Sequence, residues 1–148
     1  MENVKISLMQ LDDLKLIWDI LVTDFDDFWS PEILESELKN PNSKYFVAKC
    51  DNTILGFGGI WKAVDVMHIT DICVRKKFRQ QGIATLLLKE LIAETKKQNI
   101  TSITLEVKTT NIPAQNLYSK FGFEILGIRK KYYKNRDDAY IMTMEVNK

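Results

Sequence analysis

The chain has 148 residues, of which 45% are hydrophobic and 28% are charged, and its net charge is +1. This composition excludes a disordered chain and predicts one domain spanning residues 1–148. The near-neutral charge gives no overall field for nucleic acid or an anionic membrane, so any anion must be bound locally. The N-terminus has no signal-peptide pattern, and no apolar run approaches the ~20 residues that span a bilayer, which predicts a cytoplasmic protein.

The first forty residues predict one strand and two helices. Val4–Leu8 is a short strand, and Asp12-Asp13 open a helix, since acidic residues favour the first turn of a helix. A loop at residues 23–29 precedes the second helix. Ser30-Pro31 is a cap followed by a first-turn proline, and Asn40-Pro41 ends this helix.

The rest of the chain alternates between short strand patterns and helical patterns. In order, we expect strands at 45–50, 53–61 and 67–74, a helix at 82–99, a strand at 102–107, a helix at 113–121, and strands at 123–133 and 139–146. The full order is β-α-α-β-β-β-α-β-α-β-β. It predicts an α/β fold with a mixed central sheet and helices on both faces.

The cysteines and the single histidine give no metal-binding pattern. Cys50 and Cys73 form no CxxC pair, and His68 alone adds little to a metal site. We therefore expect two reduced thiols and no bound metal. Cys73 also has no adjacent base that would activate it as a covalent acyl carrier.

A basic turn joins the strand that ends at Val74 to the helix that follows. The N-terminus of a helix presents unpaired N–H groups to an anion, and Gly82 lets the backbone approach a ligand closely. Four cations accompany this turn, at Arg75, Lys76, Lys77 and Arg79. Neither a Walker loop nor a GxGxxG fingerprint is present. The turn therefore predicts a pyrophosphate site made of backbone amides, the alternative being an ordinary turn with solvated cations.

Two motifs carry a resemblance to a known family. The turn resembles the acyl-CoA motif of the Gcn5-related N-acetyltransferases, [RQ]-x-x-G-x-[GA], with its matches at Arg79, Gly82 and Ala84. Leu105–Phe123 looks like the family's later signature of an asparagine, a small residue, Leu-Tyr and Gly-Phe. The resemblance covers nearly the whole chain, and it implies the family's fold and acetyl-CoA as co-substrate.

A closer likeness is to the bacterial ribosomal-protein-alanine N-acetyltransferases. It is carried by DDFWS at 26–30, LEV at 105–107 and IRKKYYKNRDDAYIM at 128–142. The likeness implies acetylation of the N-terminal alanine of a small-subunit ribosomal protein. The partner would then be a protein N-terminus, without direct binding of nucleic acid.

The resemblance also implies where the coenzyme is held. In the family, the strand that ends at Val74 leaves its neighbour at a bulge, and its backbone groups bind the pantetheine. Asn111 resembles the family's coenzyme-contacting asparagine, although by itself it reads as a helix cap. The implied coenzyme contacts are Ile72, Cys73, Val74, Arg79, Gln80, Gln81, Gly82, Ile83, Ala84 and Asn111.

Glu106 is the proton acceptor that the resemblance implies. An α-amine has a pKa of ~7.7–8.0, so a carboxylate within reach must take its proton before attack. Strand alternation places Glu106 on the polar side of residues 102–107, which suggests a face that opens onto a cleft. The alternative for Glu106 is a solvated carboxylate at the end of the strand, without a catalytic role. The alternative base is His68, at a position where such enzymes often carry a glutamate. Parity places His68 with Ile72 and Val74 unless a bulge intervenes.

Tyr118 is the proton donor that the resemblance implies. A phenol with a pKa near ~10 stays protonated at neutral pH and can donate to the departing thiolate of the coenzyme. Judged from the residue alone, a helical tyrosine packs its ring in the core and leaves its hydroxyl at the surface.

The acceptor side is the least specified part of the sequence. Phe28 and Trp29 in the 23–29 loop could form one wall of a peptide site, while Asp24, Asp26 and Asp27 would favour a cationic acceptor. The other wall could come from Tyr132 or Tyr133, of which strand alternation turns only one inward, and we name Tyr133 as the candidate. The alternative is a solvated acidic loop with both aromatic side chains in the core. The alternative functions are acetylation of a lysine or small amine, and a non-catalytic acyl-CoA-binding module.

Overall fold

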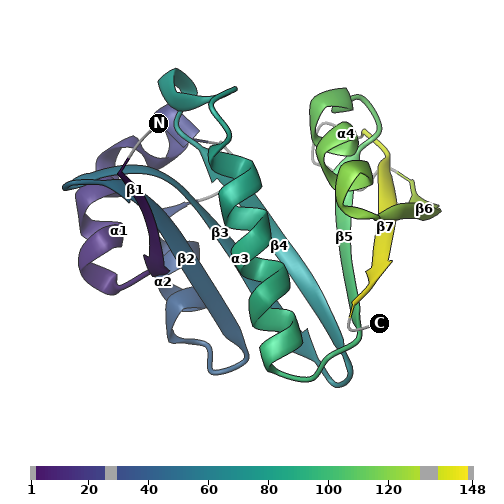
Figure 1. Cartoon of the computed structure of the whole chain (residues 1–148). Coiled ribbons are helices and arrows are strands. Elements are labelled where there is room, and N and C mark those ends of the chain that lie inside the picture. The colour runs from purple at the N-terminus through teal and green to yellow at the C-terminus, as the bar shows by residue number, and fades with distance from the viewer. Residues whose placement is uncertain (1–2, 26–29, 131–136, 147–148) are drawn as a thin grey trace.

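The computed structural model describes residues 3–25, 30–130 and 137–146, and these form one seven-stranded sheet with helices packed on it (Figure 1). The strands are β1 (Val4–Leu8), β2 (Ser43–Cys50), β3 (Thr53–Ala63), β4 (Val66–Val74), β5 (Ser102–Lys108), β6 (Glu124–Arg129) and β7 (Ala139–Glu145). The helices are α1 (Leu11–Ile17), α2 (Pro31–Lys39), α3 (Ile83–Lys97) and α4 (Ile112–Phe121), with short helical segments η1 (Trp18–Ile20), η2 (Leu21–Phe25) and η3 (Lys76–Phe78).

The sheet runs in the order β1-β2-β3-β4-β5-β7-β6, with one parallel pair, β4 and β5, among antiparallel neighbours. This is the mixed sheet that the order of elements predicted. The strand predicted at 123–133 ends at Arg129, and residues 131–136 lie outside the described part of the chain.

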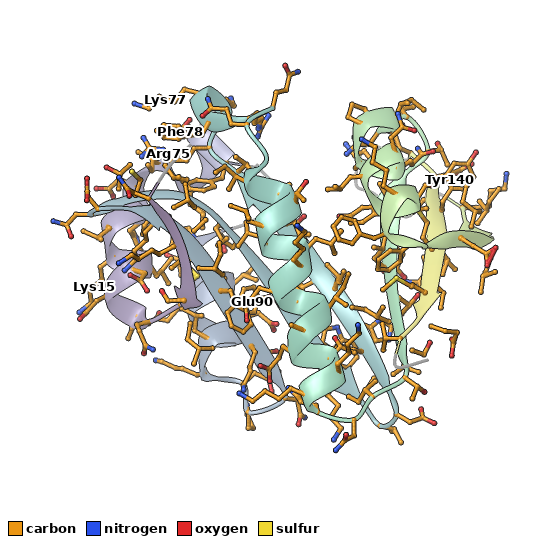
Figure 2. All side chains as sticks on the ribbon, in the orientation of Figure 1. Lys15, Arg75, Lys77, Phe78, Glu90 and Tyr140 are labelled. Atoms are coloured by element: carbon orange, nitrogen blue, oxygen red, sulfur yellow. The ribbon has the colours of Figure 1, made fainter. Side chains whose placement is uncertain are left out.

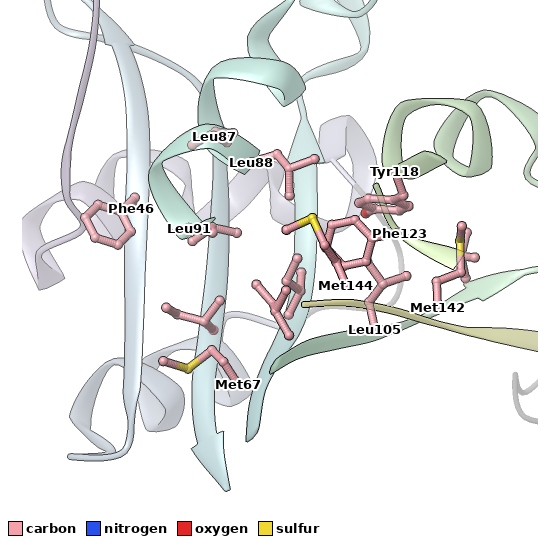
Figure 3. Packing of buried hydrophobic residues seen from close by; sticks show 14 of the residues in the cluster. Phe46, Met67, Leu87, Leu88, Leu91, Leu105, Tyr118, Phe123, Met142 and Met144 are labelled. Atoms are coloured by element: carbon pink, nitrogen blue, oxygen red, sulfur yellow. The ribbon is translucent and has the colours of Figure 1, made fainter. Parts of the chain in front are cut away.

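Helices cover both faces of the sheet, as predicted, because β2, β3 and β4 bury side chains on both sides. In β2, Phe46 and Ala48 belong to a core that includes α3 and α4 (Figure 3), whereas Tyr45 and Val47 belong to a second core with α1 and α2. The two cores therefore mark two faces, one under α3 and α4 and the other under α1 and α2.

The helix ends follow the predicted capping residues. The Ser30 side chain accepts a hydrogen bond from the Ile33 amide, and Pro31 occupies the first turn of α2. Gly122 ends α4 with a φ of 104°, which glycine adopts without the cost of a Cβ. Within residues 3–25, 30–130 and 137–146, the structure contains no helix with the length and apolar character needed to cross a bilayer.

The expected loop at 23–29 begins instead as a helix, since η2 extends to Phe25. Leu21 and Phe25 are almost completely buried, and the Phe25 ring lies 5.4 Å from that of Phe57. Burial of these two side chains on the sheet overrides the weak local pattern of this segment.

The sheet divides between β4 and β5. These strands pair only at Met67–Ile103 and His68–Thr104, near the start of both. Two residues after the last pair, β4 carries one extra residue, Thr70, opposite the register shift between Gly59 and Ile60 of β3. A bulge of this kind bends its strand, and β4 then continues without pairing to β5. This is the bulge that the resemblance implied.

Candidate active site

The turn between β4 and α3 has the geometry of an anion site. Gly82 caps α3 with a φ of 83°, and no described atom lies within 4 Å of the position of a Cβ there. The first intrahelical bond runs from the Leu86 amide to the Gly82 carbonyl, so the amides of Ile83, Ala84 and Thr85 precede the helical ladder. These amides and the open space beside Gly82 suit a phosphate group.

The four cations of this turn divide into two kinds. Arg75, Lys77 and Phe78 lie together at the end of the molecule where α3 begins (Figure 2), and both cations stand over the Phe78 ring. Lys77 is exposed, as Lys76 is, but the side chains of Arg75 and Arg79 hydrogen-bond to η2. Of the four cations, only Lys76 and Lys77 are therefore exposed and without a hydrogen bond to η2. The sequence did not predict this difference between the lysines and the arginines.

The pairing of β4 with β3 determines which backbone groups of β4 point toward the unpaired edge, on the side of β5. The Arg75 amide donates to the Leu55 carbonyl, and the antiparallel alternation from this bond directs the backbone of Cys73 toward β3. Ile72 and Val74 then direct their backbone groups to the opposite edge. There the Ile72 amide donates to Asp71 Oδ1 at 2.8 Å. Of the three residues predicted to contact pantetheine, Ile72 and Val74 have the suitable direction.

Glu106 lies on β5 just beyond the point where β4 and β5 separate. Ile103, Leu105 and Val107 are buried in the core under α3 and α4, so Glu106 points to the opposite face, as strand alternation predicted. Its side chain is 20% exposed, and Oε2 lies 3.4 Å from an Arg129 guanidinium nitrogen. Arg129 was not predicted as a partner of Glu106, although it lies within the C-terminal motif.

His68 lies on the same face as Glu106, because Met67 and Ile69 on either side of it are buried toward α3. Its ring stacks on that of Trp61 with the centroids 4.7 Å apart, and its Cα partner in β5 is Thr104. The bulge at Thr70 does intervene, so His68 is not on the face of Ile72 and Val74. His68 therefore remains a candidate for the base role beside Glu106.

Tyr118 is on the other face of the sheet. It belongs to the core under α3 and α4, is 9% exposed, and packs edge-on against Phe123 with the ring centroids 5.6 Å apart (Figure 3). The ring thus packs as expected for a helical tyrosine. Glu106 and Tyr118 therefore lie on opposite faces of the sheet.

The remaining predicted contacts are placed only in part. Asn111 caps α4, and its side chain accepts a hydrogen bond from the Ala114 amide at 3.2 Å. Asp24 forms an ion pair with Arg75, so its charge is already balanced within the protein. Phe28, Trp29, Tyr133, Asp26 and Asp27 lie outside the described residues.

A shallow groove of about 490 Å³ lies elsewhere, between the second half of α3, the end of α4 and β7. Its lining includes Lys89, Ile92, Lys96, Phe121 and Met144, and none of the predicted site residues. The groove is therefore separate from the site described above. Among the described residues, no group of three or more His, Cys, Asp or Glu side chains could hold a metal ion.

Comparison with known proteins gives a consistent result. Residues 14–123 match the acetyltransferase (GNAT) family. A Bacillus subtilis protein, provisionally named ribosomal protein bS18-alanine N-acetyltransferase, is 35% identical over 141 residues, which are 94% of this chain and 93% of that protein.

Two solved structures have the same fold. The ribosomal-protein-S18-alanine N-acetyltransferase of Escherichia coli is 27% identical with a TM-score of 0.88, covering 98% of this chain and 95% of that chain. A GNAT family acetyltransferase of Elizabethkingia anophelis, solved with acetyl-CoA bound, is 25% identical with a TM-score of 0.77, covering 99% and 100%. The chain belongs to the GNAT acetyltransferase family.

Proposed function

We propose that this protein transfers the acetyl group of acetyl-CoA to the N-terminal α-amine of another protein. The observation that carries the proposal is the divide between β4 and β5. There β4 and β5 stop pairing after His68–Thr104, the turn at Gly82 follows β4, and Glu106 lies two residues beyond the last pair on β5. The chain would act as one N-acetyltransferase domain over residues 1–148, in the cytoplasm.

In this proposal, the chain holds the coenzyme mainly through backbone groups. The amides at the start of α3 bind the pyrophosphate, with Gln80, Gln81 and Gly82 forming the turn. The Ile72 and Val74 edge of β4 lies along the pantetheine. Binding would displace the Asp71 carboxylate from the Ile72 amide, which then donates to the thioester carbonyl.

The two faces of the sheet supply different steps of the reaction. Glu106 accepts a proton from the α-ammonium group of the acceptor, and the neutral amine attacks the thioester carbonyl carbon. The C–S bond breaks, Tyr118 donates its phenolic proton to the thiolate, and the nitrogen of the new amide loses its second proton to water, which returns a proton to the Tyr118 oxygen. Direct transfer of this kind needs no covalent acyl-enzyme. Cys73 Sγ does donate a hydrogen bond to Asp71 Oδ2, a neighbouring carboxylate that the sequence did not predict, but Cys73 is buried in the core under α1 and α2.

The acceptor we propose is the N-terminal alanine of a small-subunit ribosomal protein. The support is the printed activity of the relatives from Bacillus subtilis, Salmonella typhimurium and Escherichia coli, each named for alanine acetylation of that protein. Phe28, Trp29 and Tyr133 remain the predicted acceptor contacts.

The test is an acetyl-CoA assay with four acceptors: a peptide beginning with alanine, the same peptide with a blocked α-amine, an internal-lysine peptide and spermine. Mass spectrometry then locates the acetylated nitrogen. We expect acetylation of the free α-amine alone. Modification of only the lysine or spermine would retain acetyl transfer but refute the protein N-terminus, whereas acetyl-CoA binding without turnover would favour a non-catalytic binding module.

A further inference from the structure

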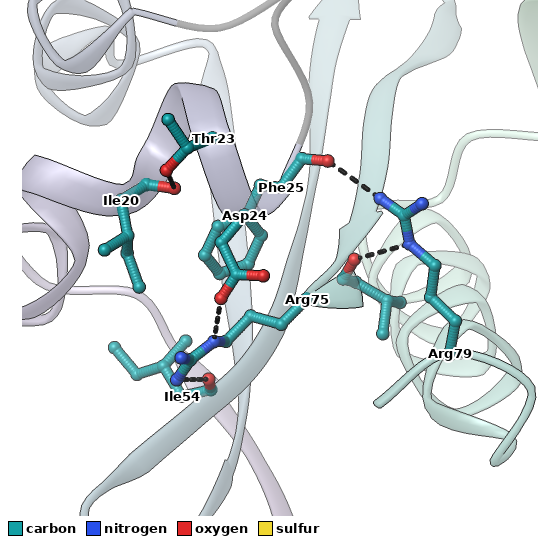
Figure 4. A network of polar contacts seen from close by, with 8 residues as sticks. Ile20, Thr23, Asp24, Phe25, Ile54, Arg75 and Arg79 are labelled. Carbon is teal, nitrogen blue, oxygen red and sulfur yellow. Dashed lines mark hydrogen bonds and ion pairs between the residues drawn. The ribbon is translucent and has the colours of Figure 1, made fainter. Parts of the chain in front are cut away.

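Two arginines next to the coenzyme turn hydrogen-bond to η2. Arg75 Nε donates to Asp24 Oδ2 at 2.7 Å, and Arg79 Nη2 donates to the Phe25 carbonyl at 2.7 Å (Figure 4). Both acceptors lie in η2, more than 50 residues earlier in the chain. The two contacts, which we call the arginine bridge, therefore connect the turn at 75–84 to η2.

Each guanidinium also contacts a backbone carbonyl of the sheet. Arg79 Nε donates to the Val74 carbonyl at 2.9 Å, and Arg75 Nη1 donates to the Ile54 carbonyl at 3.5 Å. A planar guanidinium can hold two acceptors at once, whereas a lysine ammonium gives no such fixed fork. The bridge thus fixes η2 to the ends of two strands rather than to a single side chain.

The surroundings of the bridge favour a specific contact over a solvated pair. The side chains of Arg75 and Asp24 are only 20% and 25% exposed, so water screens their charges less than at the surface. Phe25 is the last residue of η2, where carbonyl groups lack intrahelical partners and attract a cation. Its ring is buried against Phe57, which holds the carbonyl in place.

We propose that Arg75 and Arg79 are positioning residues that couple coenzyme binding to the order of η2. This inference rests on the proposed acetyl-CoA site at the turn. When the coenzyme fixes the backbone of the turn, the two guanidiniums hold Asp24 and the Phe25 carbonyl more firmly. By reciprocity, loss of the bridge weakens coenzyme binding, because the coenzyme and η2 both depend on the position of the same turn.

The experiment measures acetyl-CoA affinity by calorimetry and amide hydrogen exchange of residues 21–25 with and without acetyl-CoA. In the unaltered protein, acetyl-CoA should slow exchange in this segment. Asp24→Asn removes one side of the bridge without touching the turn, and should raise the acetyl-CoA dissociation constant about five- to tenfold. It should also abolish the ligand-dependent slowing.

Arg75→Gln and the double variant distinguish the bridge from direct phosphate binding. If the bridge is the only role of Arg75, Arg75→Gln should raise the acetyl-CoA dissociation constant as much as Asp24→Asn does. The double variant should then bind acetyl-CoA no more weakly than either single variant. Were Arg75 a phosphate ligand, its variant would bind more weakly than Asp24→Asn and the two effects would add. That result would overturn the inference.

Glu35→Gln is the matched control, because it removes the same charge from an exposed ion pair with Lys39 on α2. It should leave affinity and exchange unchanged, and thermal unfolding checks that each variant is folded. If the Asp24→Asn variant is folded and its acetyl-CoA affinity and amide exchange are unaltered, the inference about the bridge is refuted but the proposed function is not. No acetyl-CoA binding by the unaltered protein would instead refute the proposed function, and the inference with it.

Discussion

The two sides of β4 are built differently. Toward β3 it is paired from Val66 to Val74, interrupted only by the bulge at Thr70, whereas toward β5 it is paired at two positions. Hydrogen bonding along β1, β2, β3 and β4 joins these four strands into one scaffold. Because β4 separates from β5 soon after both begin, the other edge of β4 is open to a ligand. We therefore expect substitutions to change stability where the sheet is continuous and to change the rate of the reaction where it divides.

The largest expected effect is on the divided side. Glu106→Gln keeps the size of the side chain but removes proton acceptance, and should lower kcat by ~10²–10⁴ with acetyl-CoA affinity retained. Steady-state kinetics and calorimetry measure the two quantities. An unchanged kcat would move the base role to His68 or to water, and His68→Gln would then be the variant to measure.

The opposite face of the divide should show the next largest effect. Tyr118→Phe keeps the ring that packs against Phe123 but removes the hydroxyl, and should lower kcat by ~10². The midpoint of thermal unfolding should change little, because the buried area is preserved. A variant that lost stability but kept its kcat would show that Tyr118 has only a packing role.

On the continuous side, substitutions should affect stability instead of rate. A Cβ at Gly59 would lie inside the Tyr45 ring, so Gly59→Ala should lower the free energy of unfolding by about 1–3 kcal/mol. Gly58→Ala is the control, since a Cβ there meets its neighbours at 3.4 Å, ordinary contact. Urea unfolding compares the variants, and equal losses at both positions would contradict the steric explanation.

The smallest effect concerns a buried carboxylate on α3. Burial raises the pKa of Glu94, but hydrogen bonds from Lys44 at 2.9 Å and Gln98 at 2.8 Å outweigh it, so the pKa lies below its ordinary 4.5. A carboxylate whose pKa is lower in the folded state than in the unfolded state stabilises the protein at pH values above its unfolded-state pKa. This stabilisation is lost as the pH falls through the folded-state pKa. Glu94→Gln should therefore cost about 1 kcal/mol or less at pH 7.

The difference between Glu94→Gln and the unaltered protein should shrink below pH 4.5 and vanish once the folded pKa is passed. Thermal unfolding from pH 7 to pH 3 measures this, with Glu35→Gln as the exposed control. A difference that stayed constant with pH would assign the effect to packing instead of charge.

Local features were predictable wherever neighbouring residues determine the conformation. Ser30-Pro31, Gly82 and Gly122 mark helix ends through capping and positive φ, which depend on a few consecutive residues. The alternation in 102–107 likewise predicted the face of Glu106, because β5 has no irregularity in its pairing with β7.

His68 shows where such reasoning stops. Simple parity placed it with Ile72 and Val74, and the single extra residue at Thr70 reversed that assignment. The bulge belongs to the pairing of two strands, so neither strand alone reveals it. The same is true of Trp61, whose stacking on His68 depends on the register between β3 and β4.

The sequence alone thus determined the order of elements, the amide-lined turn and the pair of family motifs, because each depends on residues close together in the chain. Only the tertiary structure determined which partners the charged side chains contact. Arg75 and Arg79 meet η2, and Glu106 meets Arg129, only after the sheet has formed. A guanidinium can serve an anion or a carbonyl equally well, and the partner is chosen by what folding brings within hydrogen-bonding distance.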